Sequence, residues 1–193
     1  SNVAKGEITF DTVTKEKTVT AKNIPTKDVA EDEAMKKKFA YVDEKSKAYS
    51  NEVVGEVTET FIKNPDFITG EKEITTMPTA QLMETPVMEL INEVQQHFAK
   101  SDVSSAALFN FGSNLEKGPF KRKDVAFIYK YTNTLMGVNI TGENLLKYME
   151  WSADYYNQLM PGDLTISFDE NVRGYNYDMF YGIEYKIDIT KPK

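Results

Sequence analysis

The chain has 193 residues, of which 40% are hydrophobic and 27% charged, which is ordinary for a soluble globular protein. Its 23 basic and 30 acidic residues give a net charge of −7, which argues against a nucleic-acid polymer or an anionic membrane as partner. Cysteine is absent, which excludes disulfides, thiolate metal sites and thiol catalysis, and no apolar run reaches the ~18 residues of a membrane span.

The N-terminal part of the chain contains a predicted hairpin followed by a charged helix. Alternating side chains predict a β-hairpin over residues 6–22, with its turn at residues 14–17. A helix is predicted from about Asp32 to Tyr49, with one narrow apolar stripe opposite charged residues. Such a helix is typical of an element that lies across a surface or joins two domains. The stripe consists of Met35, Phe39, Val42 and Tyr49.

The middle of the chain predicts a strand, a helix and a second strand. The first strand covers Val53 to Ile62, and a loop rich in proline, glycine and aspartate follows at residues 64–70. Thr85 is a plausible N-cap, with Pro86 at the first helical position, where a missing N–H costs nothing. A buried strand is then predicted from Asp102 to Asn110. The predicted buried face of the helix consists of Met88, Ile91, Val94 and Phe98.

The C-terminal third predicts two more helices among further strands. A short helix covers Lys123 to Tyr129, and a strand covers Leu135 to Ile140. Thr141 caps a third helix, which ends by Pro161-Gly162, and strands follow near residues 164–168 and 181–189. This order of elements predicts an α+β fold, with helices packed on a mixed or antiparallel sheet.

Most self-contained catalytic motifs are missing from the sequence. His97 is the only histidine. One histidine cannot supply the several ligands of a hydrolytic metal centre, and it leaves no spare histidine as the base of a Ser-His-Asp triad. We interpret His97 as an ordinary residue that lies on the helix surface or is half-buried. The run from Asp169 starts like a calcium loop but has Arg173 and Phe180 where ligands are needed. The sequence therefore predicts no catalytic residue and no metal ligand.

Two stretches combine aromatic rings with amides in a way that suits a nucleobase. They are residues 108–112 (Leu-Phe-Asn-Phe-Gly) and residues 129–135 (Tyr-Lys-Tyr-Thr-Asn-Thr-Leu). A ring can stack on a base while the asparagine amide offers a donor and an acceptor to the base edge. Spacing alone favours the simpler interpretation, in which these aromatics are core residues of adjacent strands.

The second stretch and its surroundings resemble the C-terminal domain of the 5′-nucleotidase family. That family carries an aromatic-x-Asn-Thr-Leu segment, a strand, Leu-Thr-Gly and a helix, and the match here covers roughly residues 52–193. Residues 138, 140–142 and 146–151 continue the family match. Further short strings resemble the 2′,3′-cyclic-nucleotide 2′-phosphodiesterase/3′-nucleotidase branch, at residues 150–153, 156–158, 174–178, 182–185 and 187–192, and residues 102–107, 118–119 and 124–125 continue the match upstream.

The resemblance implies a division of the chain into three parts. Residues 1–27 would hold the start of an excised piece and the tail of a preceding metallophosphoesterase domain. Residues 28–51 would form the interdomain linker helix. Residues 52–193 would form the nucleotide-recognition domain, incomplete at its C-terminal end. The chain begins with Ser1-Asn2 instead of Met, which is typical of a cleaved tag.

The resemblance also implies the roles of particular residues. Tyr131 falls on the first base-stacking aromatic and Asn133 on the amide that accompanies it. Relatives have a Gly-rich segment with arginine after the Asp102 strand, whereas residues 110–114 (Asn-Phe-Gly-Ser-Asn) contain no arginine. Phe109, Asn110 and Gly112, which belong to the aromatic and amide stretch at residues 108–112, are further candidates for nucleoside binding. The second stacking aromatic of the family has no counterpart before Lys193.

We therefore expect a nucleoside-recognition domain of a secreted, metal-dependent 2′,3′-cyclic-nucleotide 2′-phosphodiesterase/3′-nucleotidase. Its partners would be the nucleoside or nucleotide substrate and an N-terminal metallophosphoesterase domain in the same polypeptide, which would bind two divalent metal ions. This piece itself would need no cofactor and be catalytically silent. By family, the protein would act outside the cell, in the periplasm or at the cell wall. The alternatives are a 5′-nucleotidase specificity domain and a non-catalytic cell-surface binding module.

Overall fold

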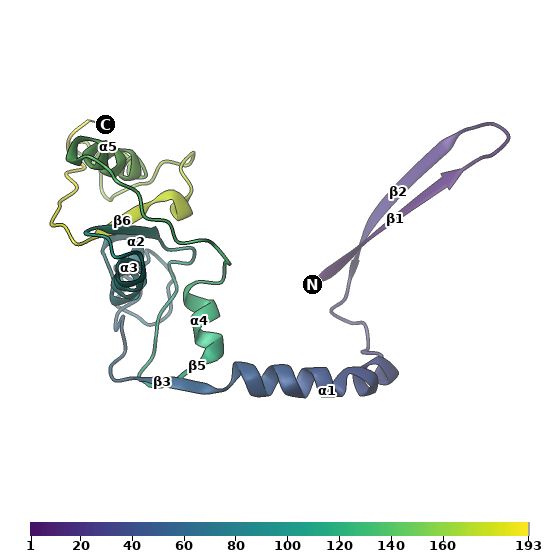
Figure 1. Ribbon diagram of the computed structural model, residues 1–193. Coiled ribbons are helices and arrows are strands. Elements are labelled where there is room, and N and C mark those ends of the chain that lie inside the picture. Colours follow the sequence, from purple (N-terminus) through teal and green to yellow (C-terminus); the bar gives the residue numbers. More distant parts are fainter. Residues whose placement is uncertain (193) are drawn as a thin grey trace. The chain divides into compact units, whose positions relative to one another are not determined.

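The structure, a computed structural model, describes residues 1–192, and Figure 1 traces its helices and strands. The chain divides into two compact units, Ser1–Ala48 and Tyr49–Lys193. The boundary falls two residues before the end of a long helix. The first unit contains β1 (Asn2–Phe10), β2 (Lys17–Pro25) and most of α1 (Glu33–Ser50).

The first unit begins with a hairpin, which confirms the prediction for residues 6–22. β1 and β2 pair antiparallel along their full length, so both strands are longer than predicted. The turn is closed by Asp11, whose carboxylate accepts the backbone N–H groups of Val13 and Thr14, both at 2.8 Å. Lys15 has a φ of 63° and takes the left-handed conformation that completes the loop.

Helix α1 confirms the predicted charged helix. It starts after Asp32, whose carboxylate accepts the N–H of Met35 at 2.9 Å and so caps the first turn. The four residues of the predicted stripe are between 48% and 64% exposed, and no residue of α1 is buried. Among residues 1–192, no helix has the combination of length and apolar character needed to cross a membrane.

The second unit is an α+β domain, as predicted, with short antiparallel strand pairs. β3 pairs with β5, and β4 pairs with β6. Helix α3 packs against both β4 and β6, and α5 packs against β6 (Figure 1). The elements are β3 (Val53–Val57), α2 (Thr79–Leu82), α3 (Pro86–Ala99), β4 (Ser104–Ala107), β5 (Gly118–Lys121), α4 (Arg122–Ile128), α5 (Gly142–Ala153), the 3₁₀ helix η1 (Gly174–Asn176) and β6 (Asp178–Tyr181).

Helix α3 supplies the centre of the core. Its predicted buried face is confirmed for Met88 and Ile91, which are 0% and 8% exposed. The prediction is wrong for Val94 and Phe98, which are exposed. The observed buried face consists of Val87, Met88, Ile91 and Asn92, and on the next turn Gln95 donates to the carbonyl of Ser105 in β4 at 3.3 Å. The buried face is therefore rotated about the helix axis relative to the predicted stripe, which leaves Val94 and Phe98 outside it.

Buried polar side chains hold β6 between α3 and α5. Asn92 on α3 donates from Nδ2 to the carbonyl oxygen of Met179 at 3.1 Å. Ser152 on α5 donates to the carbonyl of Asp178 and accepts from its backbone N–H, both at 2.8 Å. Ser104 on β4 donates to the carbonyl of Asn92 at 2.8 Å. These side chains bond to backbone groups of neighbouring elements and so help to fix the order of the layers, although the Oδ1 of Asn92 is buried without a hydrogen-bond partner.

The helix starts agree with the sequence more closely than the helix ends. α3 begins at Pro86 with Thr85 at the N-cap position, but the Thr85 hydroxyl makes no capping hydrogen bond. Thr141 does cap α5, since its hydroxyl accepts the N–H of Asn144 at 3.3 Å. α4 confirms the short helix predicted near residues 123–129. α5 ends at Ala153, well before Pro161.

Two predicted strands are present but shorter or displaced. The strand predicted over Val53–Ile62 ends at Val57; beyond it, Ile62 bonds instead to the side chain of Asn114, which accepts its N–H at 2.9 Å. The strand predicted over residues 181–189 lies earlier, as β6. It ends where Gly182, with a φ of 90°, turns the chain away.

Two other predicted strands are wrong. Residues 135–140 form no strand, and all of them are exposed. Residues 164–168 contribute a single bridge, between Tyr156 and Phe168. Both segments have apolar residues suited to strands, but side-chain pattern specifies a strand only where a neighbouring edge completes the hydrogen bonds. The short elements α2 and β5 were not predicted.

A buried carboxylate organises the loop between β3 and α2. Asp66 is 0% exposed. Its oxygens accept the backbone N–H groups of Ile68 and Thr69 at 3.0 Å, and those of Thr75 and Thr76 at 2.9 and 2.7 Å. The Thr76 hydroxyl donates to it at 2.5 Å. The hydrogen bonds from the Thr69 backbone and the Thr76 side chain, with the others, hold the pKa of Asp66 far below its ordinary value.

The hydrogen bonds to Asp66 make the free energy of unfolding of the second unit depend on pH at acidic pH. Because the folded-state pKa is depressed, the carboxylate stabilises the fold above its unfolded pKa near 3.8, and this contribution is lost as the pH falls further. Asp66→Asn is therefore expected to be less stable than the wild type at pH 7, with the gap narrowing below about pH 5. Urea unfolding at several pH values measures it, with the exposed Glu170→Gln as control. A gap that is constant with pH would contradict the assignment.

Candidate functional site

Three aromatic rings from two distant segments meet at one surface of the second unit. Phe109 follows β4, whereas Tyr129 and Tyr131 follow α4. The ring centroid of Phe109 lies 4.7 Å from that of Tyr131 and 5.2 Å from that of Tyr129, with the rings edge to face. The two tyrosine rings are 6.4 Å apart at 87°. The rings pack directly on one another, so a ligand would lie on their outer surface.

Tyr131 offers the most accessible ring of the three. It is 47% exposed, Phe109 is 38% exposed, and Tyr129 is half-buried against the hydrophobic core. The ammonium group of Lys130 lies 5.3 Å from the Tyr131 ring centroid. An exposed ring held in place by other rings is suited to stacking, because little side-chain entropy is lost when a ligand binds.

The amide of Asn133 completes this group. Its Nδ2 donates to the phenol oxygen of Tyr129 at 2.8 Å. The structure thus brings together three of the residues predicted from sequence, Phe109, Tyr131 and Asn133. It joins them to Tyr129, which the prediction had not included. The repeated tyrosine at 129 and 131 was a signal for it, because both rings precede the asparagine at even spacing.

The other two predicted residues, Asn110 and Gly112, lie in the turn after Phe109. The side-chain oxygen of Asn110 accepts the N–H of Gly112 at 2.9 Å, and the Asn110 carbonyl accepts the N–H of Ser113 at 2.9 Å. Buried Ser113 donates from its hydroxyl to the carbonyl of Phe127 on α4 at 3.1 Å. Asn110 and Gly112 therefore shape the turn that holds Phe109 beside α4, and the Asn110 oxygen is already engaged there.

Helix α4 is anchored at the end opposite the aromatic rings. The guanidinium of Arg122 donates to one carboxylate oxygen of Glu52, at 3.1 Å from Nε and 2.5 Å from Nη2. It also lies 4.4 Å from the ring centroid of Tyr49. The seven residues of α4 are thus fixed at their start by this ion pair and lead directly into Tyr129.

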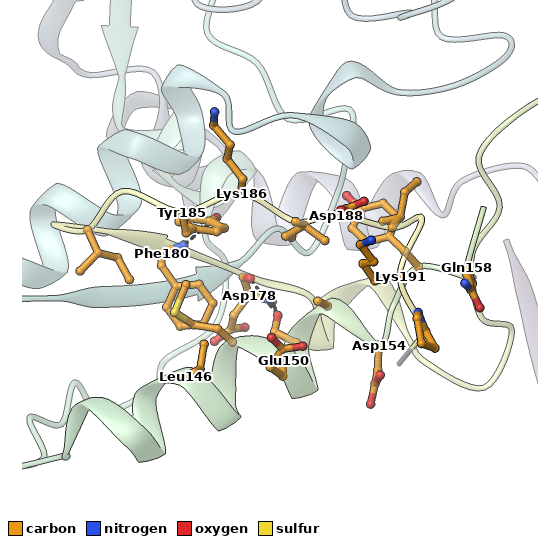
Figure 2. A pocket seen from close by; sticks show the side chains of 18 of the residues that line it. Leu146, Glu150, Asp154, Gln158, Asp178, Phe180, Tyr185, Lys186, Asp188 and Lys191 are labelled. Atoms are coloured by element: carbon orange, nitrogen blue, oxygen red, sulfur yellow. Dashed lines mark hydrogen bonds between the residues drawn. The ribbon is translucent and has the colours of Figure 1, made fainter. Parts of the chain in front are cut away.

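A separate cavity of about 680 Å³ lies between α5 and residues 183–192 (Figure 2). Glu150 on α5 and Asp154 just after it border the cavity on one side. Lys186, Asp188 and Lys191 border it from the C-terminal segment. Across its whole lining, five carboxyl groups face two lysines, which disfavours a phosphate. None of the five residues predicted to bind nucleoside lines this cavity. The aromatic surface and this cavity are therefore different places on the molecule.

The residues described in the structure do not fit a catalytic metal centre. Within residues 1–192, no group of three or more histidine, cysteine, aspartate or glutamate side chains is placed to hold a metal ion. His97 is an exposed residue of α3 and contacts the ring of Phe98 edge-on, at 5.1 Å.

The fold is similar to part of a solved nucleotidase structure. A 5′-nucleotidase structure from Staphylococcus aureus, solved in complex with α-ketoglutarate, superposes on this chain with a TM-score of 0.69. The superposition covers 96% of this chain and 34% of the Staphylococcus aureus chain. Sequence identity is 18%, so this likeness concerns the fold. The sequence pattern of the 5′-nucleotidase C-terminal domain matches residues 53–193, and the chain belongs to that family.

Relatives with known activities are similar in sequence over part of their length. The trifunctional nucleotide phosphoesterase YfkN of Bacillus subtilis is 30% identical over 135 residues, which are 58% of this chain and 9% of YfkN. A 2′,3′-cyclic-nucleotide 2′-phosphodiesterase/3′-nucleotidase of Salmonella typhimurium is 30% identical over 139 residues, 58% of this chain and 21% of the enzyme. The chain thus spans about a fifth or less of these relatives.

Proposed function

We propose that this chain supplies the nucleoside-binding surface of a phosphoesterase of the 2′,3′-cyclic-nucleotide 2′-phosphodiesterase/3′-nucleotidase type. The observation that carries the proposal is the half-exposed Tyr131 ring, held against Phe109 at 4.7 Å with the Asn133 amide nearby. Stacking on such a ring contributes about 1–3 kcal/mol per base. Membership in the 5′-nucleotidase C-terminal family and the named activities of the relatives support the same role.

The proposed division of labour leaves the chemistry to another part of the polypeptide. A preceding metallophosphoesterase domain would hold two divalent metal ions, which would supply the nucleophilic water and neutralise phosphate charge. The residues described here would bind and orient the nucleoside, so that the phosphate is presented in a reactive position. From the family resemblance we also propose a location in the periplasm, at the cell wall or outside the cell.

Calorimetry with adenosine and 3′-AMP tests the proposed nucleoside site. Both ligands are expected to bind, and Tyr131→Ala is expected to weaken binding about 5- to 150-fold, because the stacking surface is removed. The matched control is Tyr175→Ala, which removes a ring of similar exposure (55%) from η1. The purified chain is expected to hydrolyse neither 3′-AMP nor 2′,3′-cyclic AMP when divalent metal is added.

The alternatives give different results in the same experiments. If the folded wild type binds no nucleoside but binds a glycan, a cell-surface binding module replaces the proposal. Specificity for 5′-nucleotides is a second candidate, because the structural neighbour from Staphylococcus aureus is described as a 5′-nucleotidase. Assays of the intact parent enzyme with 5′-AMP and with 2′,3′-cyclic AMP separate these two nucleotidase types.

A further inference from the structure

Residues 183–189 have the side-chain pattern of a β-strand but no strand partner. Isoleucine or tyrosine alternates with a charged residue along the segment, which reads Ile-Glu-Tyr-Lys-Ile-Asp-Ile. Residues 184–188 contain no bend or turn, and the charged side chains are exposed. Within residues 1–192, the backbone N–H and C=O groups of residues 183–187 make no hydrogen bond. An extended segment with free backbone groups is a template for a further strand.

The body of the second unit holds this segment in place. The phenol oxygen of Tyr185 accepts the backbone N–H of Phe180 at 3.2 Å, and the two rings meet edge to face at 5.8 Å between centroids. Further along, the carbonyl of Ile189 accepts the N–H of Leu159 at 2.8 Å, and the Ile189 side chain packs against the hydrophobic core. A partner strand would therefore meet an edge that is already ordered, which lowers the entropic cost of pairing.

The sequence of the segment is complementary to itself when two copies run antiparallel. With Tyr185 placed opposite the same residue of a second copy, each Ile183 lies opposite an Ile187. Each Glu184 then lies opposite a Lys186, so that ion pairs form on one face and apolar pairs on the other. A twofold axis at Tyr185 generates this arrangement, as a symmetric dimer requires.

Other registers of the same two strands are unfavourable. A shift by one residue turns the apolar side chains of one copy toward the charged face of the other. A shift by two residues in one direction places Lys186 opposite Lys186 and Glu184 opposite Asp188. The same shift in the other direction places Glu184 opposite Glu184. Like charges directly opposite each other are destabilising, so the charge pattern specifies the register centred on Tyr185.

We propose that residues 183–187 form a dimerisation strand, which pairs antiparallel with the same residues of a second copy of this chain about a twofold axis at Tyr185. The pairing gives partners to backbone groups that a single chain leaves to water. A strand pair of five residues from each copy is a small interface, so the dimer forms reversibly and at high protein concentration. The inference concerns assembly and is independent of the proposed nucleoside-binding function.

Sedimentation velocity of the full chain, at concentrations rising to about 1 mM, tests the proposed dimer. The wild type is expected to shift from monomer toward dimer as the concentration rises. Glu184→Lys and Lys186→Glu each turn both ion pairs into like-charge pairs, and each is expected to weaken dimerisation about 5-fold or more. The matched control is Glu170→Lys, which makes the same charge change at another exposed position and is expected to leave dimerisation unchanged.

Two charge exchanges distinguish pairing in this register from a general effect of net charge. The double variant Glu184→Lys/Lys186→Glu is expected to dimerise as the wild type does, because every cross-strand pair again joins opposite charges. An equimolar mixture of the two single variants is expected to form a heterodimer more tightly than either variant forms a homodimer. In that heterodimer one strand carries two lysines and the other two glutamates.

Three results would overturn the inference. The first is a wild type that remains monomeric at about 1 mM. The second is dimerisation that the single variants leave unchanged, or that neither the double variant nor the mixture restores. The third is a monomer in which the amide protons of residues 184–187 are protected from hydrogen exchange, which would assign this edge to another segment of the same chain.

Discussion

Met179→Ala is expected to lower the free energy of unfolding of the second unit by about 2–5 kcal/mol, since it empties a site at the centre of the core. Met179 is 2% exposed and lies on β6 opposite Ala106 of β4. It belongs to the same buried cluster as Val87 and Met88 of α3. Its neighbours are fixed by helix and strand hydrogen bonds and can collapse into the cavity only in part, so both lost burial and the remaining void contribute.

Urea unfolding followed by circular dichroism measures this effect. Met179→Leu nearly conserves the side-chain volume and is expected to cost less than about 1.5 kcal/mol. Met160→Ala is the control for a surface methionine, since Met160 is 53% exposed. A loss of less than about 1 kcal/mol for Met179→Ala would show that β6 is not packed as described.

Gly182→Ala is expected to destabilise the second unit by about 2–4 kcal/mol. Gly182 has a φ of 90°, a conformation that a residue with a Cβ rarely adopts. An added Cβ would also collide with the carbonyl oxygen of Asp102 and lie 2.8 Å from Nε2 of Gln96. That nitrogen donates to the same carbonyl at 2.8 Å, so the substitution also breaks the link between α3 and the residues entering β4.

Gly162→Ala separates the cost of backbone strain from the cost of the steric collision. Gly162 also has a positive φ, of 102°, but an added Cβ would meet nothing within 4 Å. It is expected to cost only the backbone strain of about 1–2 kcal/mol. Thermal unfolding of the two variants therefore measures the steric contribution by difference. Equal losses for Gly182→Ala and Gly162→Ala would indicate that the close approach to Asp102 relaxes without cost.

The helices were predictable because their signals are local. Asp32, Pro86 and Thr141 each mark the start of a helix that the structure contains. Strands were less predictable, because a strand needs a partner that the local pattern does not identify. Residues 135–140 have strand-like side chains and remain unpaired, whereas Gly118–Lys121, with two residues unfavourable to strands, pairs with β3.

The candidate site was only partly predictable for a related reason. The pairing of aromatic rings with an asparagine was visible in the sequence, but spacing alone favoured core residues, and Tyr131 and Asn133 were predicted through the resemblance to the family. The contact between Phe109 and Tyr131 joins residues 22 positions apart and depends on how the turn after Phe109 is held against α4, where Ser113 bonds to the carbonyl of Phe127. The hydrogen bond of Asn133 to Tyr129 depends on a side-chain direction in an irregular segment, which no periodic pattern specifies.

Under the proposed function, the exposed segment of residues 130–140 would separate ligand choice from folding. Its side chains contribute little to the core, so exchanges there are expected to leave the stability of the domain almost unchanged. The rings of Phe109 and Tyr129, in contrast, are constrained by packing on one another. Substitutions in the segment could then change the ligand preference of the surface in small steps while the scaffold persists.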